Sequence, residues 1–354
     1  MNLAPRQIEQ YVPGQPFNDQ ATPINTLMTT FLKLQTRRSV LVAGGAFLAA
    51  PTQLLAQSWP AKPIRLVVPF PPGGLLDNMA RLISPRLTQV LGQAAVIDNK
   101  AGAGGNVGAA EVARAQPDGY TLLLASPPLT ISPALYKTMP YKPEQIEPVA
   151  LMGRVPNVLL VKSTSKITSV KELTALAKTQ PGKVNYGSNG NGTSLHLSAE
   201  LYKSTAGIFI THIPYRGSAP AMTALLAGEI DMMFDNLPPA MGQIQAGTVR
   251  ALAVTSTQRS KALPNVPTMA EAGLPGFDVS AWFGLAAPAG TPAAVVKRLE
   301  QALETVAKMP EVAEAMQRQG ADPTFQDSRA MATFMAADAA KWKRVAAYAN
   351  ITLD

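Results

Sequence analysis

Apolar residues along positions 57–354 alternate between short continuous runs and stretches with helical spacing. The runs at 64–68 and 120–125 predict buried strands, and the apolar positions after Gly74 repeat with the period of a helix. Further strands are predicted at 94–97, 158–161, 184–187, 208–214, 230–234 and 249–255, and further helices at 107–115, 170–178, 194–204, 219–227, 237–245, 293–307, 311–319 and 328–349. This order of elements predicts an α/β protein with parallel or mixed sheets covered by helices.

Two segments divide the chain into lobes. Residues 57–161 together with 282–354 are expected to form lobe 1, and residues 162–281 an inserted lobe 2, because the segments 158–162 and 281–287 would cross between them. Two α/β lobes joined by two segments make a hinged molecule with a cleft, where small ligands commonly bind.

Residues 1–56 are expected to be an N-terminal extension and export signal. Arg37 and Arg38 precede a short, mildly apolar stretch and a small-residue cleavage site near Ala56. The arginine pair resembles a twin-arginine signal, but an ordinary secretory signal that contains two arginines fits as well. The long polar stretch before this signal indicates that translation starts at Met28.

Composition excludes several classes of site. The net charge is +8, but the 31 lysines and arginines are dispersed, so no nucleic-acid surface is expected. The chain has no cysteine and two histidines, His196 and His212, which excludes a thiol nucleophile and a Cys-ligated metal and argues against a His-rich metal site. No metal or cofactor is therefore expected.

The strand at 64–68 ends in prolines and paired glycines, and a helix follows directly. Glycines let the backbone approach a ligand closely, and the free N–H groups at a helix start favour an anion. This stretch is a candidate ligand cradle, with a tight turn that binds nothing as the alternative; its candidate contacts are Phe70, Gly73, Gly74 and Asp77. Asp77 could instead be structural, because it suits the helix macrodipole and could pair with Arg81 one turn later.

A second loop, YGSNGNGTSLHL at 186–197, repeats this arrangement in the other predicted lobe. Glycines again follow a strand, and hydroxyl side chains begin a helix. Its candidate ligand contacts are Ser188, Gly190, Gly192, Thr193 and Ser194. His196 is expected to be packed or hydrogen-bonded rather than a ligand, since no other metal-binding residue lies at ligand spacing.

Two further features have competing interpretations. The glycine-rich stretch 102–108 is similar to a dinucleotide fingerprint, but the strand after it ends without the acidic residue that would hold a ribose, so a structural turn is favoured. Asp235 ends a predicted strand, where it could contact a ligand or cap the next helix. No nucleophile, base and orienting group assemble in the sequence, and no G-x-S-x-G elbow occurs.

Five segments resemble the substrate-binding proteins of tripartite tricarboxylate transporters, the Bug family. They occur in order over essentially the whole mature chain: PFPPGGLLDNMAR (69–81), NKAGAGGNVGAAEVARAQPDGYTLL (99–123), residues 188–197, IPYRGSAPAMTALLAGEID (213–231) and LPNVPTMAEAGLPGF (263–277). The resemblance implies a type II periplasmic-binding-protein fold, a Venus flytrap whose two lobes are each a mixed sheet flanked by helices. It also implies that loops 70–77 and 188–194 hold the ligand from opposite lobes, partly through water, and that Ser126 and Asp235 line the cleft.

This resemblance also implies a function. The chain is expected to be no enzyme but a periplasmic, monomeric solute-binding protein for a small carboxylate: a di- or tricarboxylate, an amino acid or an aromatic acid. Its partners would be membrane transporter components or a sensor kinase. Ser126-Pro127-Pro128 departs from a commoner asparagine-containing loop, and Asp98 stands where the family more often has Glu, so the ligand's identity stays open. The alternative is an exported enzyme that acts on a small acyl or ester substrate in the same cleft.

Overall fold

The structure is a computed structural model that describes residues 59–348 and 351–353 of the 354-residue chain. The predicted N-terminal extension and export signal at 1–56 lie outside the described residues. In the described part, no helix combines the length and the apolar content that crossing a bilayer requires.

Ten strands form one continuous mixed sheet in the described residues. Their bounds are β1 Ile64–Val68, β2 Ala95–Asn99, β3 Thr121–Ala125, β4 Ile146–Lys162, β5 Asn185–Ser188, β6 Thr211–Pro214, β7 Met232–Asn236, β8 Val249–Val254, β9 Ser280–Pro288 and β10 Asp322–Gln326. The order is β2-β1-β3-β9-β4-β7-β5-β6, and β8 and β10 also pair with β4. Strands β1, β2 and β3 are parallel to one another, as are β5, β6 and β7, whereas β4 is antiparallel to each of its partners.

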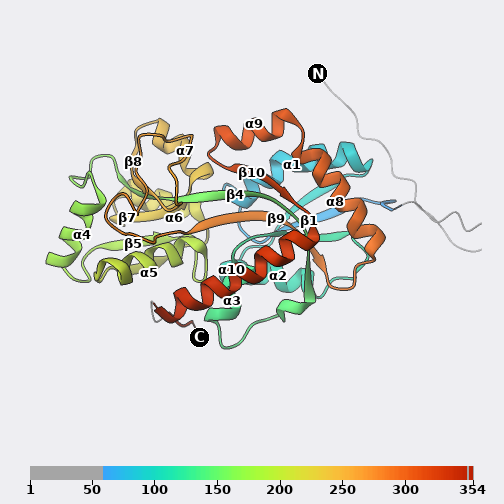
Figure 1. Ribbon diagram of the computed structural model, residues 1–354, viewed down its shortest axis with the longest axis horizontal. Helices are drawn as coiled ribbons and strands as arrows, with labels where there is room; N and C mark the ends of the chain where they lie inside the picture. The colour runs from blue at the N-terminus through green and yellow to red at the C-terminus, as the bar shows by residue number, and fades with distance from the viewer. Residues whose placement is uncertain (1–58, 349–350, 354) are drawn as a thin grey trace, which may run out of the picture. The chain divides into compact units, whose positions relative to one another are not determined.

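Helices flank the sheet, and most of them directly follow a strand (Figure 1). Their bounds are α1 Leu75–Leu91, α2 Asn106–Ala113, α3 Pro128–Leu135, α4 Val170–Thr179, α5 Ser194–Ala206, α6 Ser218–Ala227, α7 Leu237–Gln245, α8 Ala293–Ala307, α9 Pro310–Arg318 and α10 Ser328–Tyr348. Short 3₁₀ turns occupy Ala103–Gly105 and Pro143–Gln145. Helix α1 buries an apolar stripe that includes Met79, Ile83 and Leu87, and it ends at Gly92, whose φ of 73° suits a glycine C-cap.

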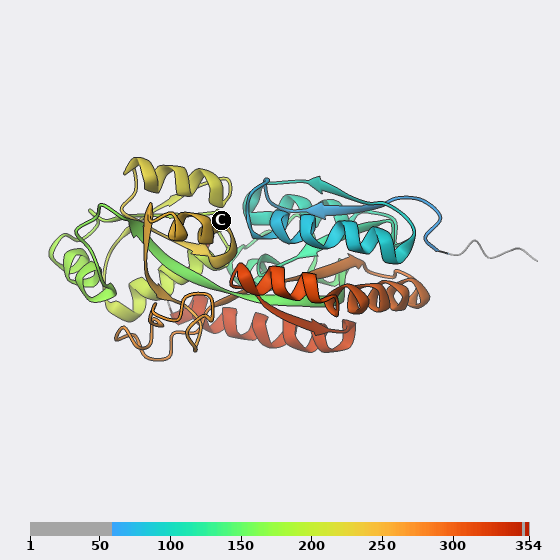
Figure 2. The same cartoon turned by 90° about the horizontal axis from the view of Figure 1, so that it is seen from above.

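Strand β4 joins two groups of strands. Its first part, Ile146 to Pro156, pairs with β9, and Asn157 to Val161 pair with β7. In Figure 2 the blue elements around β1–β3 and the yellow-green elements around β5–β7 lie at opposite ends of β4. Each group, together with its antiparallel neighbours β4 and β9 or β4 and β8, makes a mixed part of the sheet that helices flank, so the predicted two-lobe α/β fold is confirmed. The residue boundaries of the lobes stay a prediction.

Four elements were missed or shortened in the sequence prediction, and one of them, β9, lies where only a connecting segment was expected. Strand β4 begins at Ile146, not at 158, because its prolines are accommodated: the pairing with β9 shifts register next to Pro148, where a missing N–H is tolerated. Helix α3 was not predicted, since it begins at Pro128, contains Pro133 and has no polar face. Strand β10 was also missed, and it is a five-residue edge strand with a register shift.

Helix α10 is fastened to the first lobe through one buried carboxylate. Asp338 Oδ2 accepts hydrogen bonds from the indole N–H groups of Trp282 and Trp342, each at 3.0 Å, and from the Thr130 hydroxyl at 2.6 Å. Trp282 and Trp342 are almost completely buried. Three donors on one carboxylate oxygen therefore tie α3, β9 and α10 together, and α3 borders the site.

Candidate functional site

The ends of the parallel strands meet at one cavity. Strands β1, β3, β5, β6 and β7 each lead through a short loop into a helix, and open α/β sheets bind ligands at such carboxyl ends. The cavity has a volume of about 30 Å³ and is lined by residues at five helix starts: Gly74, Leu75 and Leu76 for α1, Pro127 and Pro128 for α3, Thr193 and Ser194 for α5, Gly217 and Ser218 for α6, and Asn236 for α7. Of the residues that the structure describes, no charged one lines this cavity.

The first predicted loop leaves backbone N–H groups at the start of α1 without helical partners. The first main-chain bond of α1 runs from Asn78 N–H to Gly74 C=O at 3.0 Å, so the N–H groups before Asn78 have no partner one turn back in the helix. Gly74 lines the cavity, and a Cβ added to it would have no atom within 4 Å. Phe70 also lines the cavity, and its carbonyl accepts from the Asn99 side chain at 2.9 Å, which fixes the turn.

Asp77 lies behind this loop, and both oxygens of its carboxylate already accept hydrogen bonds from the protein. Its carboxylate accepts from Gly73 N–H at 3.0 Å, from Arg81 at 2.9 and 3.0 Å, and from Asn99 at 3.1 Å. Burial alone would raise the pKa of Asp77, but these hydrogen bonds outweigh it and hold the pKa below its usual value. Asp77 and Gly73 do not line the cavity, so the structure places them as supports of the loop, which was the alternative interpretation for Asp77.

The second predicted loop approaches the cavity from the other lobe. Thr193 caps α5: its hydroxyl accepts from His196 N–H at 3.4 Å and donates to Gly190 C=O at 2.8 Å. Thr193 and Ser194 line the cavity, whereas Gly190 lines an adjoining groove.

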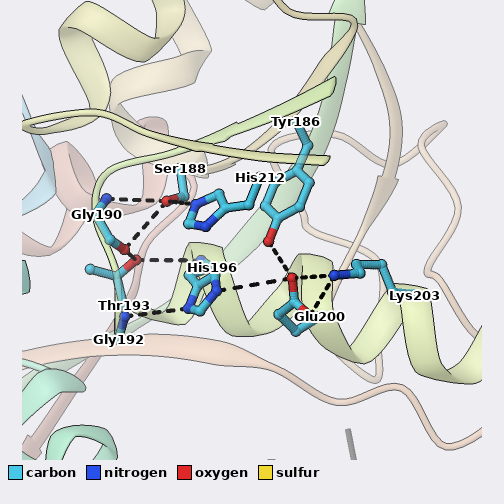
Figure 3. Close-up of polar contacts among 9 residues, drawn as sticks. All are labelled: Tyr186, Ser188, Gly190, Gly192, Thr193, His196, Glu200, Lys203 and His212. Carbon is cyan, nitrogen blue, oxygen red and sulfur yellow. Dashed lines mark hydrogen bonds and ion pairs between the residues drawn. The ribbon is translucent and has the colours of Figure 1, made fainter. Parts of the chain in front are cut away.

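Ser188, by contrast, points away from the cavity. Its hydroxyl accepts from Gly190 N–H at 3.2 Å and bonds to His212 Nε2 at 2.7 Å, and the residue is fully buried (Figure 3).

Asn189 is a cavity residue that the sequence prediction passed over, although its neighbours Ser188 and Gly190 were selected. It lines both the cavity and the adjoining groove, and its Oδ1 is buried without a hydrogen-bond partner. Asparagine in a glycine loop is an ordinary turn residue, so the sequence carried no signal that this one faces a ligand space.

Two stacked histidines lie behind the second loop. The ring of His212 stacks on Tyr186 at 4.6 Å and on His196 at 4.4 Å between centroids, and Gly192 N–H donates to His196 Nδ1 at 3.3 Å (Figure 3). Burial, with smaller contributions from neighbouring charges, lowers the pKa of His196 to about 4 and that of His212 to about 3, so both rings are neutral at neutral pH. The expectation that His196 is packed and hydrogen-bonded is confirmed.

Asp235 also lies one layer behind the cavity. Its Oδ1 accepts from Asn236 N–H at 2.8 Å, and it hydrogen-bonds the side chain of Ser218, which lines the cavity. Burial raises the pKa of Asp235 to about 7, although the bonds from Ser218 and Asn236 limit the rise. The Asn236 side chain donates to Asn157 Oδ1 at 2.7 Å, so a buried polar network joins β4 and β7 beneath the site.

A more open groove of about 630 Å³ adjoins the cavity. The two spaces share four lining residues: Phe70, Pro71, Asn189 and Gly217. Among the described residues that line the groove, Arg216 is the one charged side chain, and no acidic residue of the described chain pairs with it. Ser126 lines the cavity but not the groove.

The glycine-rich stretch 102–108 forms another wall of this groove. Gly104 has a φ of +63°, and a Cβ on it would overlap the carbonyl oxygen of Asn191 in the opposite lobe. Gly108 lies so close to Pro69 that a Cβ would be 2.9 Å from its backbone. The glycines therefore allow close backbone approach, in agreement with a structural turn.

The fold brings together one pair that resembles a nucleophile and its base, Ser188 and His212. The serine is fully buried and does not line the cavity or the groove, and no carboxylate hydrogen bond orients the His212 ring in the described chain. A substrate has no path to this hydroxyl, so the pair lacks the geometry of nucleophilic catalysis. The described residues also contain no cluster of three or more side chains suited to a metal.

Known proteins match most of the chain. Residues 79–351 match the model of the tripartite tricarboxylate transporter family receptor. The protein BugT of Bordetella pertussis is 40% identical over 303 residues, which cover 85% of this chain and 92% of BugT. The structure of R. palustris Rpa4515 with adipate is 38% identical, with a TM-score of 0.81 over 83% of this chain and 99% of that one. The structure of the periplasmic binding protein BugD is 36% identical, with a TM-score of 0.80 over 83% and 99%.

These relatives are binding proteins and not enzymes, as the resemblance in sequence implied. The residue range of the family match and the coverage of BugT both extend across the two lobes. The chain belongs to the tripartite tricarboxylate transporter family receptors, the periplasmic solute-binding proteins that include the Bug proteins.

Proposed function

We propose that this protein captures a small carboxylate in the cavity between its lobes and delivers it to a tripartite transporter or to a sensor kinase. The ligand would be a di- or tricarboxylate, an amino acid or an aromatic acid. The adipate in the complex of Rpa4515 supports a carboxylate, because that protein is 38% identical over 83% of this chain. Export through the signal at 1–56, with cleavage near Ala56, would place the mature protein in the periplasm as a monomer.

The observation that carries this proposal is the convergence of five helix starts on a cavity without a charged side chain. Each helix N-terminus carries about half a positive charge and contributes roughly 0.3–1 kcal/mol to an anion nearby. Each hydrogen bond to a charged group contributes about 1.5–3 kcal/mol, and micromolar binding needs about −8 kcal/mol. Four or five such bonds from N–H groups and hydroxyls suffice without a lysine or arginine.

The cavity is too small in this structure to hold the proposed ligand, so the lobes must lie further apart around a bound ligand. One water needs about 10–15 Å³ of such volume, so about 30 Å³ holds roughly two waters and not a whole dicarboxylate. We propose that lobe 1 (residues 57–161 and 282–354) and lobe 2 (residues 162–281) move apart to admit the ligand and then close on it. Loops 70–77 and 188–194 would contact the ligand through Phe70, Gly74, Thr193 and Ser194, with Ser126 and Asn189 completing the cavity.

A ligand screen tests the proposal. Thermal unfolding of the mature protein would be measured with dicarboxylates, citrate, amino acids and aromatic acids, and with the primary amide of each compound that binds. We expect at least one carboxylate to raise the melting temperature and its amide to have little effect, because the amide lacks the charge that the helix starts stabilise. Absence of a shift with every carboxylate, or mass-spectrometric evidence that the bound compound is consumed, would contradict the proposal.

A further inference from the structure

The ligand loop of the second lobe is hydrogen-bonded from behind by two histidines that do not line the cavity. His196, on α5, accepts from Gly192 N–H through Nδ1 at 3.3 Å, and His212, on β6, bonds to the Ser188 hydroxyl through Nε2 at 2.7 Å. Ser188 in turn accepts from Gly190 N–H at 3.2 Å. The two histidines thus hold both ends of the turn that leads to Thr193 (Figure 3).

We infer that His196 and His212 are positioning residues: as hydrogen-bond partners they fix the conformation of loop 188–194, and thereby the affinity of the cavity for its ligand. This inference rests on the proposed function, because it concerns the same loop. Neither histidine touches the cavity, so each acts through the backbone and hydroxyl groups of the loop.

The hydrogen bond from Gly192 determines which ring nitrogen of His196 carries the proton. Because Nδ1 accepts, the ring proton must be on Nε2, which faces Glu200 Oε1 at 4.0 Å. Gly192 has a φ of +72°, so its N–H direction belongs to a left-handed turn that few residues adopt. Loss of the acceptor would leave this buried N–H unpaired, and the turn would relax.

Protonation would have the same effect as removing the acceptor. A second proton on His196 would turn Nδ1 into a donor that faces the Gly192 N–H. The titratable and charged groups around it are His212 on β6, Tyr186 on β5, and Glu200 and Lys203 on α5, where Lys203 is paired with Glu200 at 2.8 Å. Burial, Lys203 and the neighbouring ring oppose the extra proton, so the pKa values of both histidines lie well below 6.5 and the loop keeps its hydrogen bonds at neutral pH.

Conservative substitutions separate this role from simple packing. Asparagine places an acceptor near the position of Nδ1, and glutamine near that of Nε2, whereas leucine fills similar space without a polar atom. The test compares His196→Asn with His196→Leu, and His212→Gln with His212→Leu. Adipate affinity would be measured by calorimetry at a temperature where near-ultraviolet circular dichroism shows all variants folded.

We expect the leucine variants to bind adipate roughly five- to ten-fold more weakly, as the loss of one hydrogen bond implies, and the Asn and Gln variants to stay within about two-fold of wild type. The affinity of wild type for adipate should also fall more steeply from pH 6 to pH 4 than that of a His196→Asn/His212→Gln double variant. Protonation of adipate itself weakens binding to both proteins equally, so the difference between the two pH profiles reports the histidines. Folded leucine variants with wild-type affinity, or coincident pH profiles, would overturn the inference.

Hydrogen exchange tests the positioning role without any ligand. In the free protein the Gly192 amide should be protected in wild type and in His196→Asn, and should exchange faster in His196→Leu. Equal protection of the Gly192 amide in wild type, His196→Asn and His196→Leu would overturn the inference, even if the leucine variant folds normally. If adipate and every other carboxylate fail to bind wild type, the proposed function fails, whereas this exchange experiment still decides whether the histidines hold the loop.

Discussion

Asp235 is a buried carboxyl directly behind the ligand cavity, and its ionisation is expected to control how well an anion binds. Its side chain contacts Ser218, which lines the cavity, and it accepts from Asn236 N–H. Burial raises its pKa to about 7. A negative charge at this position opposes a second negative charge in the cavity, so the protonated form of Asp235 should bind a carboxylate better than the ionised form.

The size of this effect follows from the pKa. With a value of about 7, Asp235 is about 90% protonated at pH 6 and about 10% protonated at pH 8. If only the protonated form binds, the apparent affinity scales with that fraction and falls at most about ten-fold between these pH values. The histidines do not contribute in this range, since their pKa values of about 4 and 3 keep them neutral.

The assay is calorimetry at pH 6 and pH 8 with a carboxylate that is fully ionised at both. Wild type should bind several-fold more tightly at pH 6, and Asp235→Asn, which resembles the protonated form, should bind with the same affinity at both pH values. Equal wild-type affinities at the two pH values, or an unchanged pH dependence in Asp235→Asn, would refute the reasoning.

The same carboxyl should make the fold less stable at higher pH. Its folded pKa of about 7 lies above the unfolded value of 3.8, so the folded state holds one more proton between these values. The free energy of unfolding is therefore expected to decrease as pH rises from about 4 to 7, by an amount on the order of 4 kcal/mol, and then to level off. Asp235→Asn should lack this contribution in denaturant unfolding.

Four other substitutions have definite expected outcomes. Gly74→Val should abolish carboxylate binding in calorimetry while the free protein melts within about 2 °C of wild type, because Gly74 lines the cavity and a Cβ added there has no atom within 4 Å; normal binding would contradict the position of this loop. Gly104→Ala should weaken binding by about ten-fold, since its Cβ would overlap Asn191 O and its φ of +63° costs about 1–2 kcal/mol; unchanged affinity would show that this contact is not part of the bound state. Arg216→Gln should weaken adipate, but not hexanoate, by a few-fold, as expected for an exposed ion pair of up to about 1 kcal/mol, and an equal effect on both ligands would exclude contact with a second carboxylate. Asp338→Ala should destabilise the fold by about 3 kcal/mol in denaturant unfolding, because three buried donors lose their acceptor; a change below about 1 kcal/mol would contradict this.

Sequence reasoning was most accurate where local pattern decides the structure. Helix α8 spans Ala293–Ala307, the predicted range, because its apolar stripe is regular and Pro292 precedes it. Helix α4 spans Val170–Thr179, close to the predicted range 170–178, and the Ser169 hydroxyl before it accepts from Glu172 N–H at 3.2 Å as an N-cap. Strand β4 was largely missed because its prolines are tolerated only through pairing with β9, a partner more than 120 residues away in sequence.

For the candidate site, too, local features were predicted from the sequence and tertiary contacts were not. Glycines and hydroxyl residues before helices located both ligand loops, because helix starts are local features. Which side chain faces the cavity depends on tertiary packing: Ser188 turns back to His212, 24 residues later in the sequence, while Asn189 faces the ligand space. The engagement of Asp235 with Ser218 could not be read from sequence either, since it requires β7 and α6 to be adjacent.

The central claim is that a carboxylate is held by helix starts in a cavity without a charged side chain. A crystal structure of the mature protein with adipate tests it most directly. One carboxylate group is predicted to lie within about 2.7–3.2 Å of N–H groups at the starts of α1 and α5. A carboxylate that is instead paired with Arg216 or another cation, with no contact to these N–H groups, would contradict the claim.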